Sequence, residues 1–184
     1  MDAFENLVSE LLWQEGYWVR TSFKVQLTKE EKRDIGRPTA PRWELDIVAY
    51  SAKYNLLRVI ECKSYLDSRG VSASSLIDPK SPNASRYKLF TDEKLRAIVF
   101  NRLALEMVNL GTCALNPKVT LGLACGKIAS AKDHDQLKTH FEQKGWELFD
   151  PVWLKAKMKK LSDASYENQI SSVVAKLLLR EKMA

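Results

Sequence analysis

The sequence has no long apolar run, since no stretch of about 18 apolar residues occurs that could form a transmembrane helix. Its first residues are acidic and amphipathic, whereas a secretory signal peptide begins with a basic segment followed by an apolar one. We therefore expect neither a membrane-embedded nor a secreted protein. At 184 residues, with apolar and charged fractions of 45% and 28%, the chain fits one folded domain.

Cysteine and histidine are also scarce. The three cysteines, Cys62, Cys113 and Cys125, are odd in number and far apart, which excludes a disulfide framework and a zinc-ligand spacing. The two histidines fall in a late predicted helix, and we expect no part for them in the chemistry. Unpaired thiols suit a reducing compartment, so the expected localisation is the cytoplasm.

Positive charge is in excess, with a formal net charge of +6. From residue 151 to the end, seven lysines and arginines stand against three acidic residues. A basic end is compatible with nucleic-acid binding. It is equally typical of solvated helices, so the charge alone does not decide between these interpretations.

Apolar periodicity predicts an alternation of helices and strands. The predicted helices cover residues 2–15, 91–110, 131–144, 151–161 and 166–180, and the predicted strands cover residues 17–27, 43–50, 56–65, 119–125 and 146–149. Residues 28–42 and 66–90 are predicted loops, and a loop as long as 66–90 is usually either functional or disordered. The order of elements indicates an α/β protein with a central mixed β-sheet flanked by helices.

Two neighbouring predicted strands carry charges in apolar surroundings. Asp46 lies in the first strand of this hairpin, and Glu61 and Lys63 lie in the second. Burying a charge is costly unless the charge is paired or bound to a metal. Because side chains alternate along a strand, Glu61 and Lys63 point to the same face, and Asp46 joins them if it lies opposite. The hairpin therefore predicts two carboxylates and one ammonium at one place.

Two carboxylates beside an ammonium suit a divalent-metal site. Mg²⁺ and Mn²⁺ prefer oxygen ligands, which Asp46 and Glu61 supply, and such an ion polarises a phosphoryl oxygen and lowers the pKa of bound water. Lys63 can neutralise charge that develops on the phosphate, or orient the water and help to deprotonate it. These parts suit phosphodiester hydrolysis, and neither a glycine-rich phosphate loop nor a Ser or Cys nucleophile constellation competes with them. A structural ion-pair network of the same residues is the alternative.

The same residues resemble a known superfamily. Asp46 followed by Glu61-Cys62-Lys63 resembles the PD-(D/E)xK signature of restriction-endonuclease-like nucleases, with Leu45 in place of the family's proline. The resemblance is closest to Mrr-like endonucleases and archaeal Holliday-junction resolvases. It implies a restriction-endonuclease-like fold, with a nuclease-like core over residues 1–150. Residues 151–184 are then extra, basic C-terminal helices of the same domain, packed on the core or used for pairing.

The N-terminal helix extends this resemblance. In the families named above it has the pattern apolar-Glu-x-x-apolar and ends in Gly-aromatic, as residues 4–8 and 16–17 do here. The resemblance implies that Glu5 completes the metal site. Glu10 is the competitor, but at about 100° per residue it falls roughly 130° from the centre of the apolar stripe, against roughly 90° for Glu5. An alternative role for Glu5 is a capping box with Asp2.

The resemblance implies a Mg²⁺- or Mn²⁺-dependent endonuclease that cuts DNA in restriction and defence, repair or recombination. Expected DNA contacts are Arg37, Arg42, Tyr65 and Arg69, of which the last lies in the 66–90 segment. A homodimer is a further expectation, because cutting both strands usually takes two sites and the helix 166–180 offers a pairing surface. The alternative is a catalytically silent DNA- or protein-binding module of the same fold that acts in a larger complex.

Overall fold

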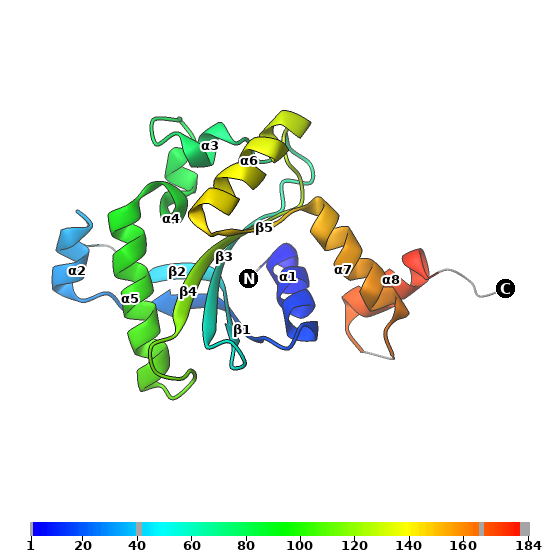
Figure 1. Cartoon of the computed structure of the whole chain (residues 1–184), viewed down its shortest axis with the longest axis horizontal. Helices are drawn as coiled ribbons and strands as arrows, with labels where there is room; N and C mark the ends of the chain where they lie inside the picture. Colours follow the sequence, from blue (N-terminus) through cyan, green and yellow to red (C-terminus); the bar gives the residue numbers. More distant parts are fainter. Residues whose placement is uncertain (1, 40–41, 166–167, 181–184) are drawn as a thin grey trace.

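The computed structural model of the chain describes all residues except 1, 40–41, 166–167 and 181–184, and its described residues form one five-stranded sheet (Figure 1). The strands are β1 (Trp18–Val25), β2 (Trp43–Ser51), β3 (Leu56–Lys63), β4 (Lys118–Cys125) and β5 (Glu147–Phe149). They lie in sequence order across the sheet, with β1, β2 and β3 antiparallel and β3, β4 and β5 parallel. The predicted mixed sheet of an α/β protein is confirmed.

Helices cover both faces of this sheet. The described helices are α1 (Ala3–Gln14), α2 (Lys29–Asp34), α3 (Ser74–Ile77), α4 (Lys88–Thr91), α5 (Glu93–Asn109), α6 (Ala131–Lys144), α7 (Pro151–Asp163) and α8 (Ile170–Leu179), with a 3₁₀ turn η1 (Ala84–Arg86). Figure 1 shows α5 on one side of the sheet and α1, α7 and α8 on the other. None of the described helices has the length and apolarity needed to cross a membrane.

Two buried clusters hold the layers together. Val99 and Leu103 of α5 and Phe141 of α6 belong to the cluster on one face of the sheet. On the other face, Ile47 and Ile60 belong to a cluster that contains the apolar residues of α1. The site residues therefore stand at the end of a hairpin that is packed on both faces.

The first helix forms for the reasons that its sequence suggests. Of its predicted apolar stripe, Phe4, Val8, Leu11 and Leu12 are buried and Leu7 is half-buried. The Asp2 carboxylate caps the helix by accepting hydrogen bonds from the backbone N–H groups of Phe4 and Glu5, at 2.7 and 2.9 Å. This cap fixes the first turn, and with it the position of Glu5 beside the sheet.

The segment 66–90 is a packed loop that three single helical turns interrupt, so the predicted loop is present but lacks these turns. It contains α3, η1 and α4, and Val71, Leu76 and Tyr87 are 0%, 2% and 2% exposed. Val71 also exchanges backbone hydrogen bonds with Lys127 and Ala129, at 3.0 and 2.9 Å. Its helices are single turns, too short to produce the apolar periodicity from which a helix is recognised.

The predicted loop 28–42 likewise contains a helix, α2. Thr28 and Glu31 form a capping box at its start. The Glu31 carboxylate also accepts hydrogen bonds from the Arg102 guanidinium of α5, at 2.7 and 3.0 Å. This contact between residues far apart in the sequence stabilises the short helix. The helix could not be predicted from the sequence, because the segment is charged and has no apolar pattern.

A glycine at the end of β4 fixes the path of the chain after β3. The Gly126 backbone N–H donates to the Lys63 carbonyl at 3.0 Å. A Cβ on Gly126 would overlap the Ser64 carbonyl oxygen and would lie 2.9 Å from Leu66 Cδ2. Only glycine fits this approach, which holds the backbone around Lys63 against β4.

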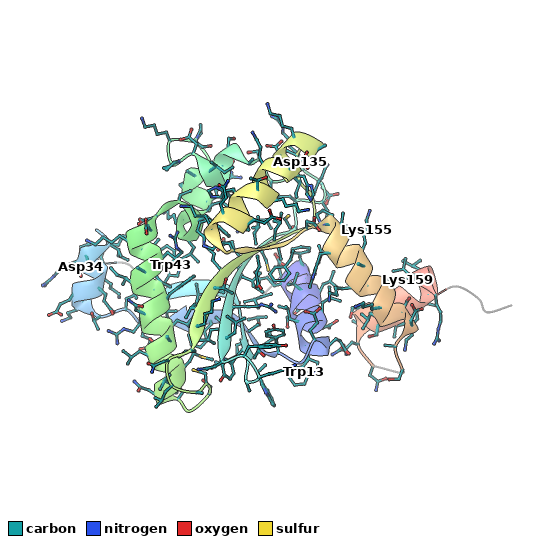
Figure 2. All side chains as sticks on the ribbon, viewed as in Figure 1. Trp13, Asp34, Trp43, Asp135, Lys155 and Lys159 are labelled. Carbon is teal, nitrogen blue, oxygen red and sulfur yellow. The ribbon has the colours of Figure 1, made fainter. Side chains whose placement is uncertain are left out.

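The C-terminal helices pack on α1. Leu161 of α7 and Ala175 of α8 belong to the same buried cluster as α1. Figure 2 shows the side chains of Lys155 and Lys159 on α7, far from α2 and α5.

The outer side of α8 is apolar and exposed. Its most exposed residues are Ile170, Leu177 and Leu178, at 81%, 79% and 76%. The surface expected for pairing is present, and the homodimer stays a prediction.

Candidate active site

The candidate site lies where β2 and β3 part. The two strands pair as far as Ile47 and Ile60, and the same register places Asp46 opposite Glu61. Beyond the last pair of residues, the strands are joined by a side chain: Asp46 Oδ2 accepts a hydrogen bond from the backbone N–H of Cys62 at 2.8 Å. The carboxylate of Asp46 is thereby held against the last residues of β3.

Lys63 completes the group. Its Nζ lies 2.6 Å from Glu61 Oε1 and 4.0 Å from Asp46 Oδ2. The side chains of Lys63, Glu61 and Asp46 are 19%, 20% and 24% exposed, so their charges are largely withdrawn from water. The structure therefore brings together the three side chains that the hairpin pattern placed at one spot, and the roles given to them stay predictions.

The Glu5 carboxylate reaches this group from α1. Its pKa is raised, first by burial and then by the negative charge of Asp46, while a hydrogen bond from the Asp2 backbone N–H acts in the opposite direction. Glu5 Oε2 is buried and accepts no hydrogen bond from any described residue. A buried oxygen without a donor is rare in folded proteins, and a cation would satisfy it.

Glu10, the competitor for this role, points elsewhere. Its carboxylate accepts a hydrogen bond from the Ser171 hydroxyl of α8. The same first helix thus directs Glu5 to the hairpin and Glu10 to the C-terminal helices. Of the two glutamates, Glu5 is the one that lies beside Asp46.

Negative charge exceeds positive charge at the site. Burial raises the pKa of Glu61, and although the Lys63 ammonium lowers it, the carboxylates of Asp46 and Glu5 raise it further. Burial alone would lower the pKa of Lys63, but the Glu61 carboxylate outweighs this effect, so that the pKa of Lys63 is raised. Lys63 is therefore a firmly protonated ammonium among three carboxylates.

This donor set fits a hard divalent cation. Within the described ranges, no three His, Cys, Asp or Glu side chains are already arranged as a metal cluster. The Lys63 ammonium occupies one oxygen of Glu61 and is itself the counter-ion of the group. The fit is supported by the unsatisfied Glu5 Oε2 and by the excess of carboxylates, since Mg²⁺ and Mn²⁺ bind carboxylate oxygens.

Comparison with known proteins adds no relative. No protein-family model, no curated protein and no solved structure matches this chain. What the site can do is therefore inferred from its own side chains and their geometry.

Tyr65 follows Lys63 in an unusual backbone conformation. Its φ of +44° lies in the left-handed region, which a bulky side chain rarely adopts. Its side chain lies beside that of Tyr87, which is 2% exposed, and burial together with Tyr65 raises the pKa of Tyr87. Strained residues of this kind gather at functional sites. Tyr65 lies near Lys63 and also lines an open cavity of about 540 Å³, whose other lining residues come mostly from the segment 66–90.

The predicted DNA contacts fall in two places. Tyr65 and Arg69 line this cavity. The Arg37 guanidinium lies over the Trp43 ring, 5.5 Å from its centroid, and Arg42 is exposed directly before β2. The structure thus places two of these residues beside the candidate site and two at the entrance to β2. Their contact with DNA stays a prediction.

Sequence reasoning missed two residues of this cavity, Arg86 and Tyr87. They stand far from Lys63 in the sequence, and only the packing of residues 66–90 brings them to its neighbour Tyr65. The concentration of arginine and tyrosine in a segment after the Glu-x-Lys triplet is the one signal that could have found them.

His134, for which the sequence predicts no part in the chemistry, lies outside this cavity. Its Nε2 is hydrogen-bonded to Asp150 Oδ2 at 2.7 Å.

We expect the substitution Glu5→Gln to stabilise the metal-free protein at neutral pH. Because the folded-state pKa of Glu5 is raised, its stabilising contribution is present below the ordinary value of 4.5 and is lost as the pH rises through the folded value. At neutral pH the ionised carboxylate of Glu5 therefore destabilises the folded protein, and the uncharged amide of glutamine does not. The melting temperature should rise by a few degrees, a shift that about 1 kcal/mol produces in a domain of this size.

Glu10→Gln is the matched control, since it removes the same charge from the same helix and should leave the melting temperature nearly unchanged. Thermal unfolding is followed in EDTA at pH 7 and again near pH 4. The gain from Glu5→Gln should shrink at the lower pH, where the wild-type carboxyl is protonated. A gain of equal size at both pH values would show that the charge of Glu5 is not its cause.

Proposed function

We propose that this protein is a metal-dependent deoxyribonuclease that hydrolyses phosphodiester bonds of DNA, with a restriction-endonuclease-like fold. The observation that carries the proposal is the largely buried group of Asp46, Glu61 and Lys63 at the parted end of the β2–β3 hairpin, with the unsatisfied Glu5 Oε2 beside it. Burial of so much negative charge is costly without a cation. Restriction and defence, repair and recombination are the settings in which such an enzyme acts, and the cytoplasm is the compartment we propose for it.

The three carboxylates of Glu5, Asp46 and Glu61 would hold Mg²⁺ or Mn²⁺. The chemistry that such an ion supplies when bound is polarisation of a phosphoryl oxygen and a lower pKa of water. Asp46 is suited to a fixed position, because the hydrogen bond from the Cys62 backbone N–H already orients its carboxylate. Glu61 orients Lys63 through the bond at 2.6 Å.

Lys63 serves the reaction as a cation. Its raised pKa keeps the ammonium protonated at neutral pH. A protonated ammonium cannot take a proton from water, so that of the two roles considered for Lys63 the electrostatic one is favoured. It donates hydrogen bonds to the phosphate and stabilises the negative charge that develops there.

The test is a cleavage assay with the purified protein on supercoiled plasmid, linear duplex, single strands and four-way junctions, each in Mg²⁺, Mn²⁺ or EDTA. We expect at least one of these DNAs to be cut in Mg²⁺ or Mn²⁺ and none to be cut in EDTA. Cutting that persists in EDTA would contradict the proposed metal site. DNA binding with a steep salt dependence, but without cutting in any metal, would instead favour the silent binding module.

A further inference from the structure

The cavity beside Tyr65 is a concave site that the nuclease proposal leaves unused. Its volume of about 540 Å³ is within the usual range for small-ligand pockets. Figure 1 shows α3 and α4 beside α6 at one end of the sheet, and the cavity is lined by residues of α3, η1 and α6. It is close to the candidate site because Tyr65, which lines the cavity, lies near Lys63.

The walls of this cavity are firmly anchored. Gly70, with φ +96°, lies so near the backbone of Ile128 and Ala129 that a side chain could not fit. Ser130 caps α6, and its hydroxyl donates a hydrogen bond to the Asp133 carboxylate, which also accepts one from the Ala73 backbone N–H at 2.8 Å. The segment 66–90 is therefore tied to the β4–α6 connection and to α6 itself, and the cavity is formed before any ligand arrives.

The lining combines positive charge with neutral hydrogen-bonding groups. Arg69 and Arg86 both line it and both are exposed. Asp133 is the one carboxylate of the described lining, and its pKa is lowered by bonds from Ser130 and Ala73 and by the charge of Arg69. The rest of the polar lining is hydroxyls and an amide, from Ser68, Ser72, Ser74, Ser75, Ser81 and Asn83. Such a surface suits an anion attached to a polar, planar group.

Tyr65 gives this surface an aromatic wall. Its backbone has φ +44°, and its side chain lines the cavity beside the buried Tyr87. Two tyrosines and two arginines around a polar cavity are the residue types on which unstacked bases and their phosphates bind. A base within a stacked duplex cannot reach into a cavity of this kind without leaving its stack.

We propose that this cavity binds one unpaired nucleotide of the DNA strand that is cut, next to the scissile phosphodiester. Arg69 and Arg86 bind its phosphate, Tyr65 contacts its base, and the serine hydroxyls and Asn83 meet the polar edge of the base. The proposal rests on the nuclease function and narrows the substrate to DNA with an unpaired nucleotide. It also accounts for the strained backbone of Tyr65, two residues after Lys63.

The experiment measures binding in EDTA, where no metal-dependent cleavage occurs. Three DNAs carry 2-aminopurine: one as a single-nucleotide bulge, one as a single-nucleotide overhang, and one in a fully paired duplex. The proteins are the wild type, Arg86→Ala, and Arg33→Ala as a matched control, since Arg33 is an exposed arginine of α2 outside the cavity. Fluorescence of 2-aminopurine reports the base, and titration gives the affinity.

The wild type should bind the bulge or the overhang about 10-fold more tightly than the paired duplex, a factor typical of stacking one base on an aromatic side chain. Arg86→Ala should reduce this preference to about twofold or less, because only the phosphate of a nucleotide that has entered the cavity meets Arg86, whereas Arg33→Ala should keep it. Preference for the bulge identifies an internal nucleotide, and preference for the overhang identifies a terminal one.

Equal affinity of the wild type for all three DNAs would overturn the proposal, as would an equal loss for Arg86→Ala and Arg33→Ala. The two proposals can fail separately. If the protein cleaves DNA with metal but does not prefer DNA with an unpaired nucleotide, the nucleotide-binding proposal is wrong and the nuclease proposal stands. If it prefers such DNA but cleaves nothing in any metal, the nuclease proposal is wrong and the cavity is still a binding site for an unpaired nucleotide.

Discussion

Replacing Lys63 with alanine should lower the rate of DNA cleavage by about 10²–10⁴-fold, the range associated with the loss of one positioned charge or proton-transfer group. Lys63 is the one cation within 4.0 Å of the described carboxylates of Asp46 and Glu61. Its removal takes away the charge that meets the phosphate. DNA affinity, measured in EDTA, should change only a few-fold, because one ammonium is a small part of a basic surface.

Lys24 supplies the matched control for this experiment. It is also a strand lysine paired with a glutamate, but Lys24 Nζ lies 3.6 Å from Glu44 Oε2 and the two side chains are 54% and 51% exposed. Lys24→Ala should cleave at the wild-type rate, since exposed ion pairs contribute little. Where Lys63→Ala fails to fold, Lys63→Met keeps the aliphatic stem. Cleavage by a folded Lys63 variant within about threefold of the wild type would leave Lys63 only a structural partner of Glu61.

The hairpin could be predicted from the sequence because its pattern is local. Strand alternation puts Glu61 and Lys63 on one face, and a short turn fixes the register that places Asp46 opposite Glu61. Charged residues in an apolar strand are conspicuous because their burial is costly. The apolar stripe of α1 could be predicted in the same way. The angle of each glutamate from this stripe favours Glu5 over Glu10 as the residue beside the hairpin, and the structure has Glu5 there.

The parts that the sequence concealed depend on partners far away in the chain. The turns of the segment 66–90 are held by Val71 against Lys127 and by the bond from Ala73 to Asp133, neither of which leaves a periodic pattern. The left-handed backbone of Tyr65 also has no signature, because local preference would put glycine or asparagine there. A cavity formed by such contacts is visible only after folding.

Replacing Asp46 with asparagine should greatly weaken metal binding, and with it metal-dependent DNA cleavage, while leaving the fold intact. The asparagine side-chain oxygen can still accept the hydrogen bond that the Cys62 backbone N–H gives to Asp46 at 2.8 Å. The negative charge is lost, and with it an oxygen ligand suited to Mg²⁺ or Mn²⁺. We expect cleavage to fall by about 10³-fold, which corresponds to about 4 kcal/mol of transition-state stabilisation.

A second readout does not depend on activity. Mn²⁺ should raise the melting temperature of the wild type, because a ligand that binds only the folded protein stabilises it, and should barely raise that of Asp46→Asn. Asp92→Asn is the control, since Asp92 caps α5 away from the hairpin and asparagine caps helices equally well. Its response to Mn²⁺ should equal that of the wild type. If Asp46→Asn keeps both the Mn²⁺ response and the cleavage rate, the carboxylate of Asp46 only braces the end of β3, and the metal ligands lie outside this hairpin.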